Sequence, residues 1–215
     1  MPWLRIRVDR IRLVVLPVLT ACLMTLGAGT SASAQELAAV GQVVQQRGVV
    51  TALREGTPRA LHLGASIYAG DQVITRENAK VAIEFRDGST LSVGSDTKVT
   101  VSQYATEGRK RGILTLLLGI IRTRLSDIWN DGFEVRARAA VASVRSTDWV
   151  TEAREDRSSV FVVAGTVAVR GVADGAEVIL EEGFGTDVET GGAPSQPKKW
   201  GSSRVEQVLA RTRLP

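Results

Sequence analysis

Short runs in which apolar and polar residues alternate cover most of the chain between residues 40 and 188. Along residues 81–86, an apolar side chain stands at every second position. Successive side chains of a strand point to opposite faces of its sheet, so this period of two predicts a half-buried strand. The same alternation recurs at residues 91–93, 99–101, 133–135 and 167–169.

Turn-forming residues separate these runs at short intervals. Glycine, asparagine and aspartate tolerate a positive φ or hydrogen-bond their own backbone, which is why they favour turns between strands. Many short strands with regular turn signals are typical of an all-β sandwich, barrel or solenoid rather than an α/β fold. The turns are predicted at residues 56–58, 70–71, 77–78, 87–88, 131–132, 174–175 and 183.

Two further segments are open to more than one interpretation. The apolar run 113–121 contains Gly119 and indicates one or two buried strands, with a buried helix as the alternative. The glycine- and proline-rich stretch 191–197 resembles a linker that closes the β region. After it, Val205, Val208 and Leu209 have helical spacing, so residues 202–213 form either a short amphipathic helix or a frayed terminus.

Residues 1–34 have the three parts of a secretory signal peptide. A basic head with four arginines precedes an apolar stretch over residues 13–28, and Ala32-Ser33-Ala34 provides a small-residue exit. The apolar stretch is shorter than the roughly 20 residues that span a bilayer, which argues against a retained anchor. We therefore expect cleavage after Ala34 and a product in the periplasm or at the cell surface.

Cys22 allows a second outcome of export. Residues 19–22, Leu-Thr-Ala-Cys, resemble the lipobox at which bacterial lipoproteins acquire a lipid anchor. The apolar core continues beyond this cysteine, however, and the small-residue exit lies further on. We favour the soluble product, in which Cys22 is an ordinary member of the leader's apolar core, and keep the lipid anchor as the alternative.

Removal of the leader changes the charge of the chain. The leader holds four of the 27 basic residues and one of the 23 acidic residues, which leaves 23 and 22. The mature chain is therefore almost neutral, and bulk charge gives no reason to expect nucleic-acid binding. Because Cys22 is the only cysteine, the mature chain forms no disulfide and depends on core burial.

The sequence lacks the groups that most catalytic and metal sites require. His62 is the only histidine, and it alternates with Leu61 and Leu63, which predicts that the imidazole points to solvent while both leucines point inward. The sequence lacks the histidines and cysteines of a zinc site, and it contains neither a nucleophile-elbow motif nor a phosphate-binding loop motif. We predict no enzyme activity, no catalytic residue, no metal site and no cofactor.

Carboxylate pairs of the kind that glycosidases use need separate consideration. The candidates are Asp71, Glu84, Asp87, Asp96 and Asp148. Three of them, Asp71, Asp87 and Asp96, stand beside glycine or serine in turn signatures, where an aspartate accepts hydrogen bonds from backbone amides. We interpret these three as turn-capping residues.

Basic and aromatic residues suggest binding surfaces. Arg109-Lys110-Arg111 is a tight basic run, and the pairs Arg122/Arg124 and Arg136/Arg138 have the i, i+2 spacing that lines one strand face. They form either a basic stripe for an acidic partner or a solvated outer face, and near-neutrality favours the latter. Among the tryptophans, Trp149 is expected in the core and Trp200 to pack the tail onto the β region.

The order of the β elements resembles the periplasmic FecR domain over residues 40–188. The resemblance rests on five pieces that occur in the family's order: residues 40–44 (Val-Gly-Gln-Val-Val), 63–75 with Gly70-Asp71, 81–89 with Asp87-Gly88-Ser89 followed by 95–97, 144–149 (Val-Arg-Ser-Thr-Asp-Trp) and 163–167 (Val-Ala-Gly-Thr-Val). Two positions depart from the pattern: Ser146 replaces the usual glycine, and Ala164 stands where an acid is common.

The resemblance implies a twisted, solenoid-like or sandwich-like stack of short strands and protein–protein contact rather than catalysis. The better-known members regulate iron–siderophore signalling and carry an anti-sigma segment and a transmembrane helix. This chain resembles a stand-alone exported FecR domain, followed by a linker and tail at residues 189–215. We expect an envelope protein as its partner, in signalling or scaffolding, with cell-wall glycan or peptidoglycan as the alternative ligand.

Overall fold

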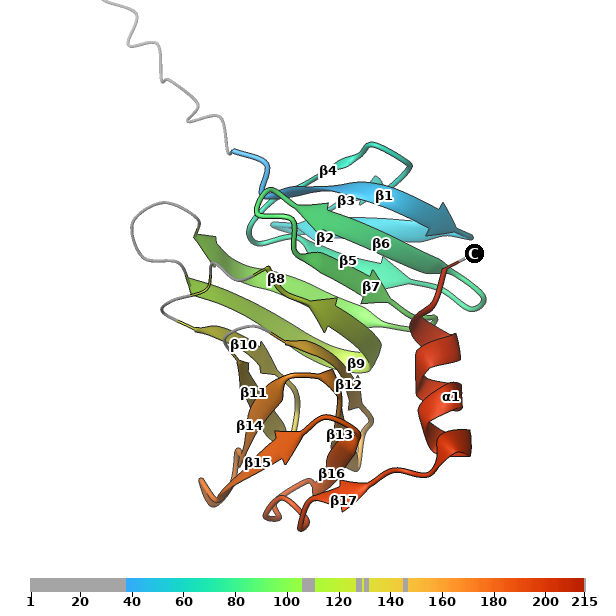
Figure 1. Cartoon of the computed structure of the whole chain (residues 1–215). Coiled ribbons are helices and arrows are strands. Elements are labelled where there is room, and N and C mark those ends of the chain that lie inside the picture. The colour runs from blue at the N-terminus through green and yellow to red at the C-terminus, as the bar shows by residue number, and fades with distance from the viewer. Residues whose placement is uncertain (1–37, 106–110, 127–128, 130–131, 145–146, 215) are drawn as a thin grey trace, which may run out of the picture. The chain divides into compact units, whose positions relative to one another are not determined.

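The computed structural model describes residues 38–105, 111–126, 129, 132–144 and 147–214. The leader, Cys22, Arg109, Lys110 and Ser146 lie outside these residues. Within them the chain is almost entirely β-strand, as the alternation predicts (Figure 1). The first nine strands are β1 (Gly41–Arg47), β2 (Val50–Arg54), β3 (Thr57–Ala60), β4 (Ser66–Ile67), β5 (Gln72–Thr75), β6 (Lys80–Phe85), β7 (Thr90–Val93), β8 (Lys98–Ala105) and β9 (Arg111–Arg124).

The second half of the chain continues the pattern and ends in a helix. Its elements are β10 (Phe133–Arg136), β11 (Ala140–Val144), β12 (Asp148–Ala153), β13 (Arg157–Ala164), β14 (Thr166–Gly171), β15 (Glu177–Glu181), β16 (Phe184–Glu189), β17 (Lys198–Lys199) and α1 (Ser202–Thr212). The run at residues 113–121 is therefore a strand rather than a buried helix, and the C-terminal tail is helical rather than frayed.

The strands pair in two layers that share β9. Sheet A has the order β4–β1–β6–β7–β9–β12–β13–β16–β17. Sheet B has the order β3–β2–β5–β8–β9–β10–β11–β14–β15. The pairing of β9 with β10 is parallel, and the other pairings are antiparallel. The result is an open sheet folded into a sandwich, which agrees with the predicted all-β class.

Gly119 is the point at which β9 passes from one sheet to the other. Before it, residues 111–118 pair with β8 in sheet B, and after it residues 121–124 pair with β7 in sheet A. Gly119 has a φ of +97°, which glycine adopts without the strain that a Cβ would cause. Thr97 completes the corner, because its Oγ1 accepts the Ile120 N–H at 3.1 Å.

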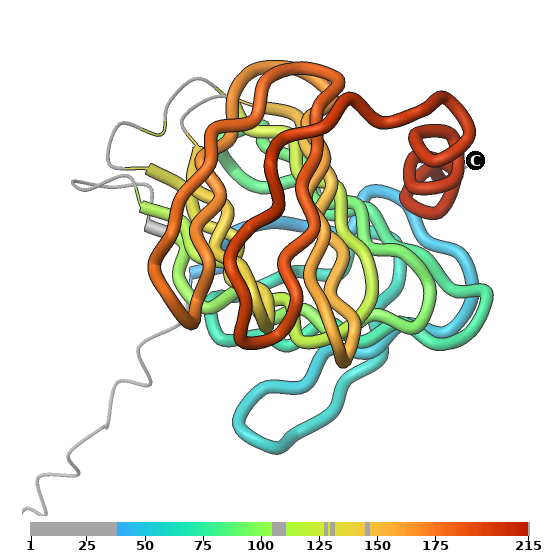
Figure 2. Tube along the Cα trace, turned by 90° about the horizontal axis from the view of Figure 1, so that it is seen from below, coloured from blue at the N-terminus to red at the C-terminus, as the bar shows by residue number. Residues whose placement is uncertain are grey.

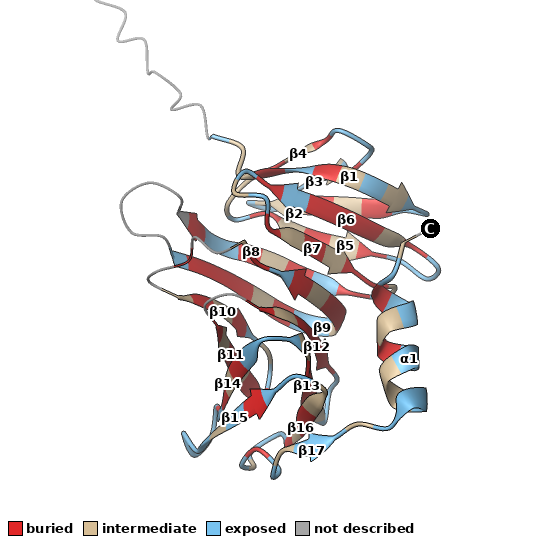
Figure 3. Cartoon of the chain, viewed as in Figure 1, coloured by how far each residue is buried: buried red, intermediate tan, exposed pale blue. Residues whose placement is uncertain are grey.

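The two sheets enclose one main hydrophobic core. Buried positions alternate with more exposed ones along many strands, as the colours of Figure 3 show, whereas β12 and β13 are buried along most of their length. At one end the core is aromatic: Phe85 stacks on Tyr104 with ring centroids 4.1 Å apart, and Trp129 meets Tyr104 edge-on at 4.9 Å. Phe133 continues the chain of edge contacts to Trp149 at 6.1 Å, so the predicted core position of Trp149 is confirmed.

A second, smaller apolar cluster lies between α1 and the outer face of sheet A. Val208 packs there with Ile120, Val150 and Phe161, and Val205, Trp200 and Leu209 surround them. Thr212 is also buried on this side of the helix. The helical spacing seen in the sequence therefore defines the face that meets the sheet. Figure 2 shows α1 outside the strand layers, reached by the red segment that follows β17.

Three expectations about local structure need correction or refinement. Leu63 is 68% exposed, because residues 63–64 form a turn rather than part of an alternating strand; Leu61 is buried and His62 exposed, as predicted. Arg138 lies in the turn after β10, so it does not share a strand face with Arg136. The stretch 191–197, expected as a linker, packs against β16. Pro194 forms an isolated β-bridge with Val188, and the Ser195 N–H donates a hydrogen bond to Asp187 O.

Candidate protein-interaction site

Asp87 is the centre of a hydrogen-bonded network that joins the β6–β7 turn to the aromatic core. Its Oδ1 accepts the Ser89 N–H at 3.1 Å and the Tyr104 hydroxyl at 2.7 Å. Its Oδ2 accepts the hydroxyls of Ser89 and Ser126 at 2.6 and 3.0 Å. The predicted turn-capping role of Asp87 is confirmed, and the carboxylate also organises side chains far away in sequence.

The network fixes the protonation state of its two acidic groups. Burial alone would raise the pKa of Asp87, but the hydrogen bonds from Ser89, Tyr104 and Ser126 outweigh burial and hold that pKa below its usual value. Burial and the bond to Asp87 raise the pKa of the Tyr104 phenol. Asp87 is therefore an ionised acceptor and Tyr104 a neutral donor, and these states suit a structural network.

Asp71 is held by two arginines of the β2–β3 hairpin. The carboxylate is fully buried, and its Oδ2 accepts the Tyr68 N–H at 3.0 Å and a hydrogen bond from Arg59 Nη2. Arg54 Nε lies 3.8 Å from Oδ1. Both guanidinium groups also lie over the Tyr68 ring, at 4.4 and 5.5 Å from its centroid. Asp71 caps its turn as predicted and, in addition, fastens the hairpin to the loop before β5.

Asp148 binds the arginine pair on the outer face of sheet A. Arg122 donates to both carboxylate oxygens, at 2.8 and 2.7 Å, and Arg124 Nε donates to Oδ2 at 3.1 Å. These arginines do share one strand face, as their spacing predicts. Burial would lower the pKa of Arg122, but the hydrogen bond from its guanidinium to Asp148 outweighs burial and raises that pKa. The stripe is thus partly neutralised within the molecule.

Glu84 and Asp148 do not form a glycosidase-type carboxylate pair. On the outer face of sheet A, Glu84 lies opposite Thr90, Thr90 opposite Arg124, and Arg124 opposite Asp148. Three strand spacings of about 4.8 Å therefore separate Glu84 from Asp148, or roughly 14 Å, which exceeds the separation in glycosidases. Asp96 lies in the β7–β8 turn, with a φ of +52°. Among the described residues, no cluster of three histidine, cysteine, aspartate or glutamate side chains could hold a metal ion.

Polar contacts also fasten the tail to sheet A. Arg204 makes two hydrogen bonds to Asp187, at 3.0 and 2.6 Å, and its guanidinium lies 3.5 Å from the Trp200 ring centroid. Trp200 stacks on Phe161, as expected of a residue that packs the tail onto the β region. At the other end of α1, Lys80 Nζ donates to Ala210 O at 2.7 Å. A cleft of about 510 Å³ remains beside this end, lined by residues that include Lys80 and Glu152.

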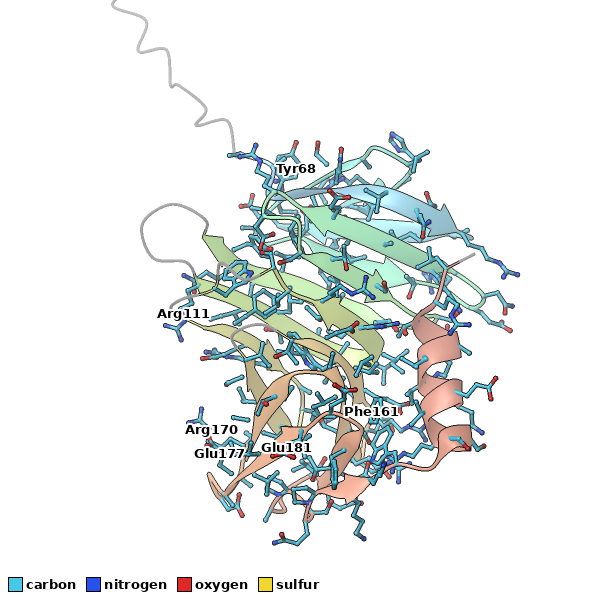
Figure 4. The ribbon with its side chains drawn as sticks, viewed as in Figure 1. Tyr68, Arg111, Phe161, Arg170, Glu177 and Glu181 are labelled. Atoms are coloured by element: carbon cyan, nitrogen blue, oxygen red, sulfur yellow. The ribbon has the colours of Figure 1, made fainter. Side chains whose placement is uncertain are left out.

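The outer face of sheet B is different, because the one helix of the described residues packs on sheet A. Its last two strands are β14 and β15, which pair with Arg170 opposite Glu177 and Thr166 opposite Glu181. Figure 4 shows Arg170, Glu177 and Glu181 on these strands, on the opposite side of the view from α1. Between the two glutamates, Ile179 is 53% exposed.

Strand β15 forms the edge of sheet B. Within the described part of the chain it pairs only with β14, so alternate backbone groups on its other side have no strand partner. We define the candidate interaction site as β15 with the outward side chains of β14. Sequence reasoning missed this site, although the alternation of Glu177, Ile179 and Glu181 with Val178 and Leu180 was a usable signal.

The geometry defines an all-β sandwich in which the candidate carboxylates at positions 71, 87 and 148 are bound within the molecule, and in the described residues β15 is an edge strand of sheet B, as β3 is at the other end. Residues 71–168 match the family model described as FecR protein. Residues 71–168 therefore match the FecR family, as the resemblance predicted. Strands β1 to β4 precede the matched range and β15 to β17 follow it, and β1 and β2 pair with matched strands.

Solved structures share this fold. Two crystal structures of a proposed anti-sigma factor from Parabacteroides distasonis, at 2.50 and 1.65 Å resolution, superpose with TM-scores of 0.54 and 0.53. Sequence identity is 16% and 18%, and the alignments cover 64% of this chain and 63% and 64% of the other. No match was found among curated proteins. None of the helices described here is long and apolar enough to cross a membrane.

Proposed function

We propose that the chain is a non-catalytic, protein-binding FecR domain of the bacterial cell envelope that acts in signalling or scaffolding. The observation that carries this proposal is the uncovered edge of β15 beside the outer face of sheet B. An edge of this kind binds an extended segment through main-chain hydrogen bonds, while alternate side chains provide specificity. A rigid sandwich behind the edge keeps it in the extended form that strand addition needs.

Two further observations support the location and the pathway. The leader pattern in residues 1–34 supports export to the envelope, where FecR domains are expected. The neighbours of similar fold are of a protein proposed to be an anti-sigma factor, which supports a place in signalling.

The placement of the tryptophans gives the glycan-binding alternative little support. Sugar-binding sites use exposed aromatic rings as platforms, whereas Trp149 is fully buried. Trp200 stacks on Phe161 and is covered by Arg204. A protein partner is therefore the better-supported ligand.

Affinity capture tests the proposal. The full chain, carrying a C-terminal tag and produced in its own cells, is crosslinked and purified from the envelope fraction. We expect one protein to be recovered reproducibly with it, and a variant unfolded by core substitution to recover none. The proposal would be overturned if no specific protein were recovered under several crosslinking chemistries. It would also be overturned if purified cell wall alone bound the chain as well as the envelope fraction does.

A further inference from the structure

The outward face of β15 has a specific chemical order. Glu177, Ile179 and Glu181 point away from the core, whereas Val178 and Leu180 point toward it. An added strand would therefore place every second side chain opposite an acid, an apolar residue and an acid in turn. Ala168 lies opposite Ile179 on β14, so the apolar position continues one strand inward.

Glu177 and Glu181 carry negative charges that no ion pair among the described residues neutralises. Neither Glu177 nor Glu181 forms an ion pair with a described cation, although Arg170 is the cross-strand neighbour of Glu177. Four other acids on the strands are bound to arginines: Glu134 to Arg111 and Arg136, Asp148 to Arg122 and Arg124, Glu152 to Arg154 and Arg211, and Asp187 to Arg204. The edge thus presents two available carboxylates on either side of an exposed isoleucine.

The same order disfavours a second copy of the chain as the occupant. If two β15 strands paired antiparallel about Ile179, Glu177 of each copy would lie opposite Glu181 of the other. Like charges directly opposite each other destabilise a strand pair. In this register the edge therefore disfavours its own copy, and a strand of opposite charge is the better partner.

From this charge complementarity, and resting on the proposed function, we propose that β15 binds an extended segment of a protein partner whose facing residues are basic, apolar and basic at alternate positions. The segment adds to sheet B as its tenth strand in the described order. Its basic side chains meet Glu177 and Glu181, and its apolar side chain covers Ile179.

A peptide probe tests this chemistry. The probe has seven residues, with lysine at positions 2 and 6, isoleucine at position 4 and threonine elsewhere; a matched peptide has glutamate at positions 2 and 6. Binding to the purified full-length product is followed by fluorescence anisotropy and by hydrogen exchange. We expect the lysine peptide to bind and to slow exchange in β15, and the glutamate peptide to do neither.

Charge-reversal variants provide the control. The double variant E177K/E181K should lose affinity for the lysine peptide by about two- to thirtyfold, as expected for two cross-strand charge pairs, and should gain affinity for the glutamate peptide. The variant E84K, an exposed acid on sheet A, should change neither affinity.

Two results would overturn the inference. In the first, the lysine peptide fails to bind while E177Q/E181Q self-associates, so the acids only keep copies apart. In the second, the peptide binds E177K/E181K as well as the unmodified chain. If the envelope partner is still captured by E177K/E181K, the proposed function stands and only this inference fails.

Discussion

Arg211 Nη1 donates a hydrogen bond of 2.8 Å to Glu152 Oε1, and this contact joins the last turn of α1 to the C-terminal end of β12. Glu152 also accepts a bond of 2.9 Å from Arg154. Arg211 and Glu152 are 59 positions apart in the sequence, so this is a long-range contact between the tail and the β region. An 11-residue helix is marginal by itself, and α1 therefore depends on this ion pair, on Lys80 and on the small apolar cluster beneath it.

The first prediction concerns the ion pair between Arg211 and Glu152, called the clasp below. R211A should lower the free energy of unfolding by only about 0.3–1 kcal/mol, because Arg211 is partly exposed and Arg154 still pairs with Glu152. It should, however, increase hydrogen exchange in α1 far more than in β12. R213A removes a neighbouring exposed arginine and is the control. Equal exchange in R211A and R213A would show that the clasp does not hold the helix.

The second prediction concerns the Asp87 network. D87N keeps the shape of the side chain but replaces one acceptor oxygen with a donor, so the hydrogen bonds cannot all be retained. We expect a loss of about 1–3 kcal/mol in urea unfolding at pH 7. Asp174 also caps a turn, through the Ala176 N–H, but without a buried network. D174N should therefore cost much less, and equal losses in the two variants would contradict the assigned role.

The third prediction is acid sensitivity. The folded-state pKa values of Asp87, Glu152 and Asp187 all lie below their usual values, because hydrogen bonds outweigh the opposing effect of burial. Each group therefore contributes stability that is complete above its unfolded pKa, 3.8 for aspartate and 4.5 for glutamate, and is lost as the pH falls through the folded value. Urea midpoints should be flat near neutrality and fall below pH about 4.5. D87N should show a shallower fall, and an unchanged slope would refute this explanation.

The fourth prediction concerns the corner at Gly119. A Cβ at this position would lie 2.6 Å from Thr97 Cα in addition to the strain of the positive φ. Gly183 has a positive φ as well, but a Cβ there would meet nothing within 4 Å. We expect G119A to cost about 2–4 kcal/mol and G183A about 1 kcal/mol in thermal or urea unfolding. A G119A variant no less stable than G183A would show that the corner is not tightly packed.

Sequence patterns predicted the strands well because burial on one face imposes a period of two that is visible locally. Residues 81–85 and 167–169 show it directly, and the turn at Asp87 was correctly interpreted. The partners of Asp87 could not be predicted, because Tyr104 lies 17 residues away. Ser89 likewise meets Trp129 from 40 residues away. Such contacts depend on how the sheets pack.

Other errors share the same origin. The passage of β9 between sheets at Gly119 leaves one continuous apolar run in the sequence, so the run did not reveal where its pairing changes. Leu63 fits an alternating pattern with Leu61 but lies in a turn, and Arg138 fits the spacing of Arg136 but lies beyond the strand. Period alone does not locate the end of a strand. The β15 edge was missed because only the strand pairing shows that, in the described part of the chain, β15 pairs with β14 alone.

Photo-crosslinking at Ile179 tests the central claim most directly. The full chain, made in its own cells with a photoreactive amino acid at position 179, is compared with the same chain modified at Val49, which is also exposed but lies far from β15 in sequence. Position 179 should crosslink a specific envelope protein, and E177K/E181K should reduce the yield of that product. A product that forms equally from position 49, or no product from position 179, would contradict a protein-binding function at this edge.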